Sequence, residues 1–218
     1  MPRFLEIFLA LLLLLVLIPF LIPIIIILFL TGEHKVFYLQ NRVGYKNQNF
    51  KILKFATMLS NSENMGSGSL TLRNDPRVLP FGSFLRKTKI NELPQIVNVI
   101  IGDLSIVGPR PQLRIDFEKY SKDIQERIYN VKPGLTGIGS IVFRDEEYLI
   151  SNASVKENPH DFYKRVIAPY KGELEIWYIE NRSLMLDIRL ILLTVWAIVN
   201  PKSMLYEKWF KDLPKKMI

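Results

Sequence analysis

The sequence predicts an α+β fold, in which one small domain follows a hydrophobic membrane segment at the N-terminus. The chain has 218 residues, which is enough for one domain with a core of its own. No charged residue occurs from Phe8 to Leu30, whereas the rest of the chain has the composition of an ordinary globular protein. In that remainder, short strand-like segments and segments with helical periodicity both occur, so strands and helices are both expected.

Residues 1–31 form the membrane segment. Their apolar run is too long for a signal peptide, and the sequence from Leu30 to Glu33 is a poor cleavage site. A helix crosses a bilayer with about 20 apolar residues, and this run is long enough. However, Pro19 and Pro23 lie inside it, and each removes a helical hydrogen bond and clashes with the preceding turn. The two prolines predict a break, and the residues alone leave a spanning helix and a re-entrant helix as equal alternatives.

Two short strands and a loop are expected after the membrane segment. Residues 36–39 alternate weakly, and residues 50–55 form a second strand-like run. Residues 41–44 and 46–49 have the composition of turns. Residues 60–69 are rich in Ser, Asn and Gly, which indicates a mobile loop.

Helices are predicted over 78–87, 92–101, 115–129 and 184–199. The clearest pattern is in 92–101, where apolar residues share one helical face. Residues 145–170 are polar and are expected to be irregular. The helix at 184–199 is strongly apolar and carries only Asp187 and Arg189 as charged residues.

The residues around this last helix do not decide whether it is buried in the core or lies at the membrane interface. Trp196 and Trp209 belong to the residue type that is enriched at the depth of the lipid headgroups. Basic residues follow in 201–218, which is read as a basic tail. An interfacial membrane helix and a buried core helix are both compatible with this pattern. The basic residues are Lys202, Lys208, Lys211, Lys215 and Lys216.

The net charge of +8 suits phosphate-bearing ligands, nucleic acid or an anionic membrane surface. The hydrophobic N-terminus favours the membrane, and no nucleic-acid recognition motif occurs, so binding of nucleic acid is disfavoured. The chain has no cysteine, which excludes disulfides and thiolate metal sites. Its two histidines, His34 and His160, show no metal-ligand spacing, so structural roles are expected for both.

A set of charged residues beside predicted turns could bind phosphate. Taken singly, each is most simply a solvated surface charge, and only the set carries weight. Arg110 lies between Pro109 and Pro111, which hold its backbone, and a planar guanidinium on a rigid loop suits bidentate phosphate binding. The other members are Lys54, Asp75, Arg77, Arg86, Glu92 and Asp103.

Five motifs in this order identify a family resemblance. They are 54–58 (KFATM), 75–86 (DPRVLPFGSFLR), 91–99 (NELPQIVNV), 102–111 (GDLSIVGPRP) and 131–137 (VKPGLTG). Their order and spacing resemble the monotopic phosphoglycosyl transferases, bacterial membrane enzymes that move a sugar phosphate from a UDP-sugar to a polyprenol phosphate. The resemblance covers nearly the whole chain.

The resemblance implies a topology that the residues alone leave open. Residues 1–31 would form a re-entrant helix with both ends cytoplasmic, and residues 32–200 a catalytic domain at the cytoplasmic face of the bacterial inner membrane. The helix near 184–199 would lie in the interface. The family breaks its membrane helix at a Ser-Pro pair, and here Ile18 stands before Pro19.

The resemblance also implies a reaction and its site. An Asp-Glu dyad opens the helix near residue 92, the aspartate attacks the β-phosphate and releases UMP, and undecaprenyl phosphate then takes the sugar phosphate. Mg²⁺ offsets the diphosphate charge, with Glu92 as its expected protein ligand. The expected donor-binding residues are Lys54, Arg77, Arg86, Pro109, Arg110 and Pro111, together with Arg144 in place of a family arginine.

Two departures from the family pattern matter. Asn91 occupies the aspartate position, and a neutral carboxamide is a poor nucleophile and a weak magnesium ligand. The replacement is engineered, or catalysis is lost, or Glu92 is the nucleophile, or the lipid phosphate attacks directly. A silent family member that binds nucleotide sugar or lipid is the alternative function. The second departure is the acidic run 145–147, read as a solvated turn or as a contact to metal or sugar. A homodimer is compatible with the sequence.

Overall fold

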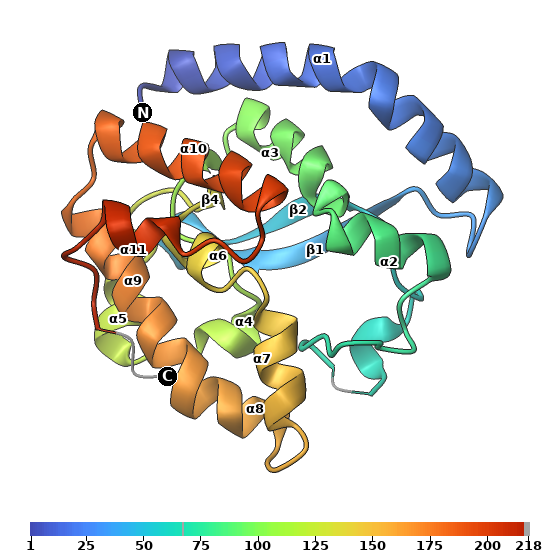
Figure 1. Cartoon of the computed structure of the whole chain (residues 1–218). Helices are drawn as coiled ribbons and strands as arrows, with labels where there is room; N and C mark the ends of the chain where they lie inside the picture. The colour runs from blue at the N-terminus through green and yellow to red at the C-terminus, as the bar shows by residue number, and fades with distance from the viewer. Residues whose placement is uncertain (67, 216–218) are drawn as a thin grey trace.

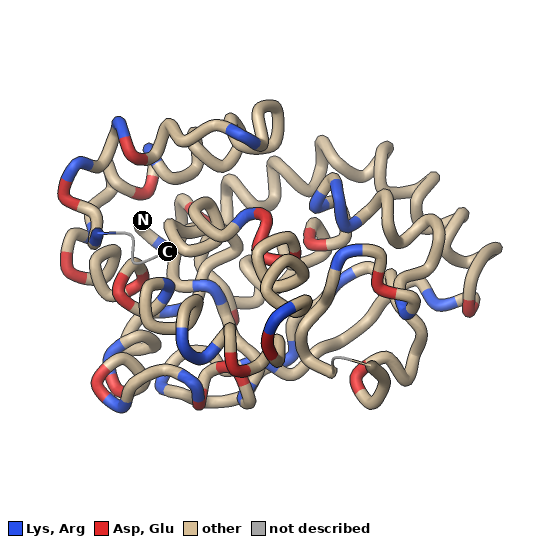
Figure 2. The backbone as a smooth tube through the Cα atoms, turned by 60° about the horizontal axis from the view of Figure 1, so that its bottom comes forward, with Lys and Arg blue, Asp and Glu red and all other residues tan. Residues whose placement is uncertain are grey.

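The computed structural model describes residues 1–66 and 68–215, and it confirms the expected mixture of helices and small sheets. The long helix α1 (Arg3–Leu30) arches over the domain in Figure 1. By length and composition, α1 is the helix of the described chain that can cross a membrane. In Figure 2 the long helix is almost free of charged residues, which occur throughout the rest of the chain.

α1 is one continuous helix, so the break predicted at Pro19 and Pro23 is absent. The helix bends instead, and its second half turns down toward the strands (Figure 1). Proline kinks a helix without ending it where the neighbouring residues are strong helix formers, as in the leucine run that precedes Pro19. The sequence therefore predicted the position of the distortion but not its extent.

The first turn of α1 is anchored to the domain by polar contacts. The Arg3 guanidinium donates to the carbonyls of Val99 at 2.5 Å and Ile100 at 3.2 Å. These carbonyls lie at the end of a helix, where a cation is favourable. Glu6, only 3% exposed, accepts hydrogen bonds from the Ser105 hydroxyl and from the backbone N–H of Ile106.

Two small sheets hold the centre of the domain. β1 (Phe37–Val43) and β2 (Asn49–Phe55) are antiparallel, while β3 (Ser105–Val107) and β4 (Gly134–Thr136) are parallel. The turn predicted at 41–44 is wrong, because the strand continues to Val43, which is completely buried. Burial of one side chain outweighs the turn-like composition of its neighbours.

Three helical segments form the side of the domain under α1. They are α2 (Pro80–Lys87), the 3-10 helix η3 (Ile90–Gln95) and α3 (Ile96–Ile101), so the predicted helix at 92–101 is confirmed in position. Lys89, between α2 and η3, has a positive φ of 62°, which separates the two helices. The start of η3 lies at the edge of a cavity.

The single helix predicted at 115–129 is wrong. The segment forms α4 (Arg114–Phe117) and α5 (Lys122–Arg127), which are separated at Ser121. The Ser121 hydroxyl accepts a hydrogen bond from the backbone N–H of Ile124 and starts the second helix. A good N-cap inside an otherwise helical pattern competes with continuation of the helix.

The irregular segment predicted at 145–170 is also wrong. It contains α7 (Glu146–Ala153), α8 (Pro159–Phe162) and a π-helical turn (Tyr163–Ile167), which continues into α9 (Ala168–Glu180). Several of its apolar side chains are buried in the core and hold these helices, although polar residues dominate the composition. The buried ones include Ile150, Tyr163 and Ile167.

α6 (Ile138–Val142), α10 (Leu184–Val199) and α11 (Leu205–Trp209) complete the fold. α11 lies in the stretch read as a basic tail, so that stretch is folded at least through Trp209, and residues 216–218 lie outside the description. α10 is partly a core helix, and its place at a membrane interface stays a prediction. Leu190 and Leu193 are in the core, whereas a second apolar face is exposed.

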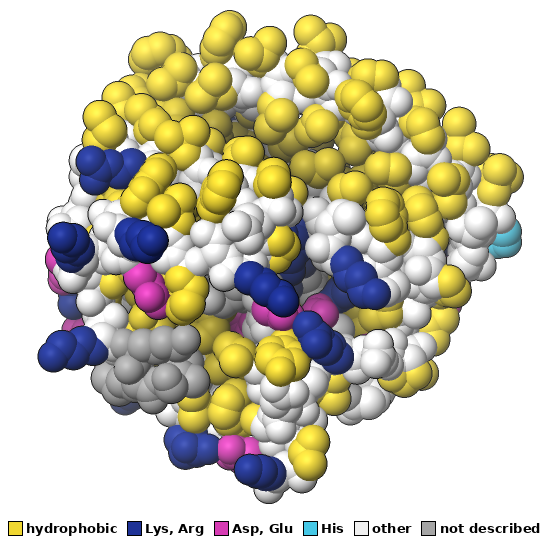
Figure 3. All heavy atoms as spheres, viewed as in Figure 1, with side chains coloured by type: hydrophobic (Ala, Val, Ile, Leu, Met, Phe, Trp, Pro, Cys, Tyr) yellow, Lys and Arg dark blue, Asp and Glu magenta, His cyan; other side chains and the backbone are white. Residues whose placement is uncertain are grey.

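The exposed apolar face of the molecule spans several elements. Figure 3 shows hydrophobic side chains across its upper part, over α1 and α10. Soluble monomers seldom expose such an extended apolar surface. The fold therefore gathers a membrane-type surface on one side. Its residues on α3 and α10 include Val97, Ile101, Leu184, Met185, Ile188, Leu192, Val195, Trp196, Ile198 and Val199.

Candidate active site

Asn91 and Glu92 lie at the start of η3, on the edge of a cavity of 780 Å³. Asn91 is 7% exposed, and its Oδ1 is buried without a hydrogen-bond partner among the described residues. Buried polar atoms nearly always have partners, so an unpartnered acceptor at this place is unusual.

Glu92 forms a bidentate ion pair with Arg110. Arg110 Nη2 lies 2.6 Å from Glu92 Oε1, and Arg110 Nη1 lies 3.3 Å from Oε2. Burial would raise the pKa of Glu92, but the charges of Arg110 and Lys54 hold it well below its usual range. The Glu92 carboxylate in turn raises the pKa of Arg110. Glu92 is therefore an anion with both oxygens occupied.

Lys54 reaches the same cavity from β2. Its ammonium donates to Gln40 Oε1 at 3.1 Å, and Arg42 donates to the same oxygen at 2.7 Å. Burial lowers the pKa of Lys54 well below its ordinary value, and the neighbouring Arg42 charge adds to this shift. Two cations that share one neutral acceptor form a site that an anion would stabilise.

The loop that carries Arg110 is fixed through its backbone. The Tyr129 hydroxyl donates to the Arg110 carbonyl at 2.8 Å, and Arg42 donates to the Pro111 carbonyl at 3.2 Å. The Pro109 carbonyl accepts from the Gly134 N–H at 2.9 Å. The two prolines expected to take part in donor binding therefore contribute a rigid support for the Arg110 side chain.

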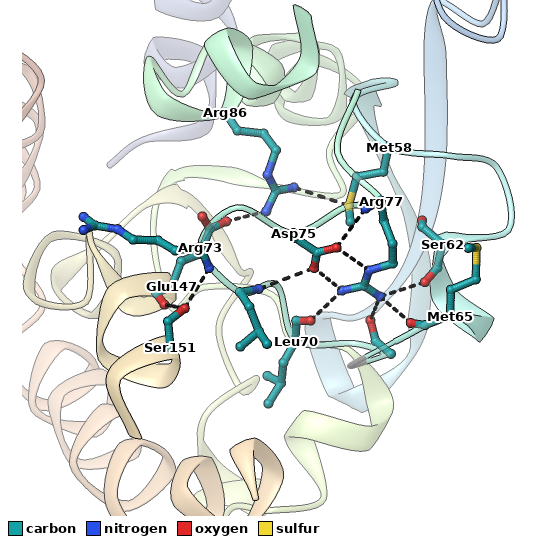
Figure 4. A network of polar contacts seen from close by, with 12 residues as sticks. Met58, Ser62, Met65, Leu70, Arg73, Asp75, Arg77, Arg86, Glu147 and Ser151 are labelled. Atoms are coloured by element: carbon teal, nitrogen blue, oxygen red, sulfur yellow. Dashed lines mark hydrogen bonds and ion pairs between the residues drawn. The ribbon is translucent and has the colours of Figure 1, made fainter. Parts of the chain in front are cut away.

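The acidic run at the start of α7 faces three cations. Glu147 forms an ion pair with Arg86, as Figure 4 shows. Glu146 Oε2 lies 2.5 Å from the ammonium of Lys171, which is 2% exposed. The third carboxylate, Asp145, forms an ion pair with Arg73 of 3.1 Å in which both side chains are more than half exposed. Glu146 and Glu147 therefore line the cavity, and the solvated-turn reading applies only to Asp145.

Arg77 is engaged in holding a loop together (Figure 4). It forms an ion pair of 2.6 Å with Asp75, with both side chains 3% exposed. Arg77 also donates to backbone carbonyls in the described part of the 60–69 loop, which was predicted to be mobile. This geometry gives Arg77 a structural role, and its predicted phosphate contact stays a prediction. The carbonyls that accept from Arg77, each at 2.8 Å, are those of Ser62, Met65, Gly68 and Leu70.

The cavity brings together most of the predicted donor-binding cations. Arg144 lines it and is half-buried, and burial lowers its pKa. The His34 ring donates from Nδ1 to the Phe29 carbonyl at 2.9 Å, and His160 Nδ1 lies 3.0 Å from the Lys119 ammonium, so both histidines contact other parts of the protein. The Lys and Arg residues that line the cavity are Lys35, Arg42, Lys54, Arg77, Arg86, Lys89, Arg110, Arg114, Arg144 and Lys171.

Sequence reasoning missed several of these residues. Arg42 was assigned to a turn, and Lys89 was not singled out. Lys171 and Glu175 are buried on α9, one helical turn apart, which is a pattern visible in the sequence but unusual enough for charged residues to be overlooked. A search for charged residues inside an otherwise apolar helical face would have found them.

The donor set for magnesium is small. Within residues 1–66 and 68–215, no group of three His, Cys, Asp or Glu side chains could hold a metal ion. Mg²⁺ commonly uses only one or two protein oxygens together with substrate phosphates and water. Glu92 lines the cavity, and a carboxylate oxygen that accepts one hydrogen bond from Arg110 keeps a second lone pair, so Glu92 fits that limited role.

Comparison with known families assigns the chain. The family described as bacterial sugar transferase matches residues 1–201. The chain belongs to this family. The match extends over α1, the cavity and α10, so it includes every element that positions Asn91, Glu92 and Arg110.

Curated relatives of this bacterial sugar transferase agree with the assignment. It is 34% identical over 177 residues to the UDP-N-acetylgalactosamine-undecaprenyl-phosphate N-acetylgalactosaminephosphotransferase of Aeromonas hydrophila, covering 80% of this chain and 38% of that protein. It is 35% identical to the UDP-glucose:undecaprenyl-phosphate glucose-1-phosphate transferase of Xanthomonas campestris pv. campestris, covering 77% of this chain and 32% of that protein. An uncharacterized sugar transferase of Bacillus subtilis, EpsL, is 37% identical, covering 73% of this chain and 68% of that protein. The chain thus spans about a third of the length of the first two.

Proposed function

We propose that this bacterial sugar transferase moves a sugar 1-phosphate from a UDP-sugar to undecaprenyl phosphate. The product would begin a surface glycan such as an exopolysaccharide or O-antigen. The observation that carries the proposal is a cation-lined cavity around Asn91 and Glu92 that adjoins a purely apolar one. The names of the Aeromonas and Xanthomonas relatives supply the substrate classes.

The donor half of the proposal rests on the charged cavity. Lys54 and Arg110 flank Glu92, and Arg86 and Lys89 line the same space. A diphosphate carries several negative charges, and cations in a partly buried cleft bind it far more strongly than cations in water. The volume of 780 Å³ falls within the range that small-molecule sites usually have.

The acceptor half rests on a second cavity of 240 Å³ beneath α1. Phe37 and Phe55 line both cavities and stack on each other with ring centroids 5.5 Å apart. A polyprenol phosphate joins a charged head to an apolar chain, and these two adjoining spaces offer both environments. The remaining residues of the apolar cavity are Leu14, Ile18, Leu21, Ile22, Ile25, Leu53, Pro94 and Val97.

For the membrane, we propose a re-entrant α1 with both ends at the cytoplasmic face of the bacterial inner membrane. The first turn of α1 is bound to α3 by Arg3, and Leu28 near its other end packs with Leu85 of α2. Both ends of the helix therefore contact one domain, which a straight spanning helix could not achieve. The exposed face of α10 would lie in the same interface.

The reaction has two possible routes, and this chain is suited to one of them. In the covalent route, a carboxylate oxygen bonds to the β-phosphorus, the bond to the bridging oxygen breaks and UMP leaves. Asn91 offers no carboxylate for this, and both oxygens of Glu92 are held by Arg110. In the direct route, a phosphate oxygen of undecaprenyl phosphate attacks the β-phosphorus and UMP leaves in one step. We propose the direct route for any transfer that this chain performs.

Magnesium is part of the proposal. Glu92 would hold the ion, which would neutralise charge on the diphosphate when bound. The residues of the chain have their own tasks: Arg110 orients Glu92, and Lys54 supplies a positive charge beside it.

A second candidate function is a silent family member that binds donor and lipid. Asn91 favours it, because replacement of a nucleophile removes the chemistry and leaves the binding cations in place. A homodimer stays a prediction for either function.

Release of UMP distinguishes the two functions. The full-length protein in nanodiscs would be given a panel of UDP-sugars with and without undecaprenyl phosphate. Direct transfer is expected to release UMP only when the acceptor is present, and the silent alternative predicts donor binding without release. UMP release without acceptor, together with a phosphosugar adduct on Glu92 by intact mass, would contradict the direct route.

A further inference from the structure

Glu175 is a buried acid that no step of the proposed reaction uses. It lies on α9 with 0% of its surface exposed. Its Oε1 accepts a hydrogen bond of 3.1 Å from the backbone N–H of Arg110. Its Oε2 is buried and has no hydrogen-bond partner among the described residues. A buried carboxyl with one oxygen unpartnered is costly, so its presence next to Arg110 requires a reason.

The backbone opposite Glu175 is shaped around its carboxyl group. A Cβ added at Gly139 would lie 2.2 Å from Glu175 Oε1, and one added at Gly137 would lie 3.9 Å from Oε2. Only a glycine at position 139 lets the start of α6 approach this closely. The carboxyl group is therefore enclosed between α6, α9 and the loop that carries Arg110.

Few charges face this enclosed group. Lys171 is on the same helix and pairs with Glu146, while Arg110 pairs with Glu92, so neither cation is reserved for Glu175. Tyr120 and Tyr129, from the α5 side, also face it, and burial raises the pKa of both phenols, which keeps them neutral. Burial raises the pKa of Glu175 to about 7. Its charge therefore changes within the physiological pH range.

We propose that Glu175 is a positioning residue, which fixes the backbone of Arg110 for the donor phosphates and, through its own charge, changes how strongly that site binds them. Arg110 is then held on both sides of its peptide, by Glu175 at the N–H and by Tyr129 at the carbonyl. An ionised Glu175 adds a negative charge behind Arg110 and reduces the positive potential of the site. A neutral Glu175 keeps the hydrogen bond and removes that opposing charge. This inference rests on the proposed donor site.

Calorimetry of UDP binding tests this inference. The full chain is measured in detergent at pH 6 and pH 8, both as the wild type and as Glu175→Gln. Glutamine keeps the size and the acceptor oxygen but is never charged. Because UDP itself titrates, the quantity compared is the ratio of the dissociation constants of the wild type and the variant at each pH. The ratio is expected to be near one at pH 6, where Glu175 is largely protonated, and about three to ten at pH 8, which is the size expected for one nearby charge in a partly solvated site.

Two further variants make the test specific. Glu173→Gln, on the same helix and only half-buried, should give the same ratio at both pH values. Glu175→Leu removes the acceptor and is uncharged like Glu175→Gln, so weaker UDP binding by Glu175→Leu than by Glu175→Gln at both pH values shows the positioning effect separately from the charge. An unchanged ratio for Glu175→Gln between pH 6 and pH 8 would overturn the inference while the donor site stands. Absence of UDP binding by the wild type at both pH values would overturn the donor site as well.

Discussion

At the scale of one residue, Asn91 is expected to leave donor binding intact and to remove the covalent step. Its side chain has nearly the shape of aspartate, so the cations around it keep their places, but it has no anionic oxygen to attack phosphorus. Glu92 cannot take over without leaving Arg110, because the pair uses both of its oxygens. The residue that looks most conservative in the site is therefore the one with the largest expected effect on the reaction.

Asn91→Asp should restore the covalent route. A carboxylate in the position of Oδ1 would lie where the amide oxygen is now buried and unpartnered. UMP release from a suitable UDP-sugar without acceptor is expected to rise from background to a readily measured single turnover. Asn98→Asp, in the same helical region but bonded to the β2 backbone, serves as the control and should release no UMP. Equal release by Asn91→Asp and the unaltered chain would contradict this account of the site.

Arg110→Ala should weaken donor binding. Loss of a charged hydrogen-bonding group costs about 1.5–3 kcal/mol, so the dissociation constant for a UDP-sugar should rise roughly tenfold to a hundredfold. Calorimetry on the full-length protein measures the change. Arg127→Ala removes an arginine whose ion pairs with Asp123 and Glu180 are exposed, and it should leave the affinity unchanged. An unaltered affinity for Arg110→Ala would remove Arg110 from the donor site.

At the scale of the element, polar interactions hold the 60–69 loop and help to position α1. The loop at 60–69 has the composition of a mobile segment, but Arg77 bonds to four of the backbone carbonyls in and around it. The bend of α1 comes from two prolines, yet contacts near both of its ends decide where the helix lies.

Arg77→Met should destabilise the protein, because it leaves the buried Asp75 carboxylate without its partner. Breaking a buried pair costs about 3–5 kcal/mol, which corresponds to a fall in Tm of roughly 10 °C for a chain of this size. Thermal unfolding in detergent measures it. Arg73→Met breaks a pair in which both side chains are more than half exposed, and its Tm should stay within about 2 °C of the original. Equal Tm values for the two variants would show that the Asp75–Arg77 pair does not hold the loop.

Replacement of Pro19 and Pro23 by leucine should drive α1 toward a spanning arrangement, because both distortions vanish. The chain has no cysteine, so single cysteines at Pro2 and Lys46 report topology by labelling with a membrane-impermeant maleimide. In the original sequence both should be labelled from the cytoplasmic side. In the double-leucine variant, a fraction of the Pro2 position should be labelled from the opposite side. Labelling of the two positions from opposite sides in the original sequence would refute the re-entrant arrangement.

At the scale of the whole molecule, one side is apolar and the cavity lies below it (Figure 3). The exposed residues of α10 extend the surface that α1 begins. Such an arrangement lets a lipid head reach the charged cavity while its chain stays near the membrane. Under the proposed function, the two substrates would meet at the boundary between water and lipid.

A fluorophore attached at Leu192→Cys should report this surface directly. Leu192 is 53% exposed on α10, and in liposomes its fluorophore should be quenched by nitroxide-labelled lipids. Val155, 84% exposed, lies between α7 and α8 at the opposite end of the molecule in Figure 1, and a label there should not be quenched. Equal quenching at the two positions would show that α10 does not face the bilayer.

The sequence predicted those parts of the site that lie in contiguous motifs. Lys54, Glu92 and Arg110 stand in separate motifs, and the fold brings them together as expected. The pairing of Glu146 with Lys171 could not be predicted, because it depends on the burial of helices that the polar composition concealed. The role of Arg77 was hidden for a related reason, since its partners are backbone carbonyls that carry no sequence signal.

The anchoring of α1 has a consequence for biosynthesis. Arg3 and Glu6 bind residues that follow them by 96 and 99 positions. A ribosome adds about 5–20 residues per second, so roughly 5–20 seconds pass before these partners exist. During that interval the newly made apolar helix has no protein surface to cover it, and the bilayer is its only stable environment. We therefore expect the enzyme to be assembled at the membrane, where α1 is inserted before the later part of the chain folds against it.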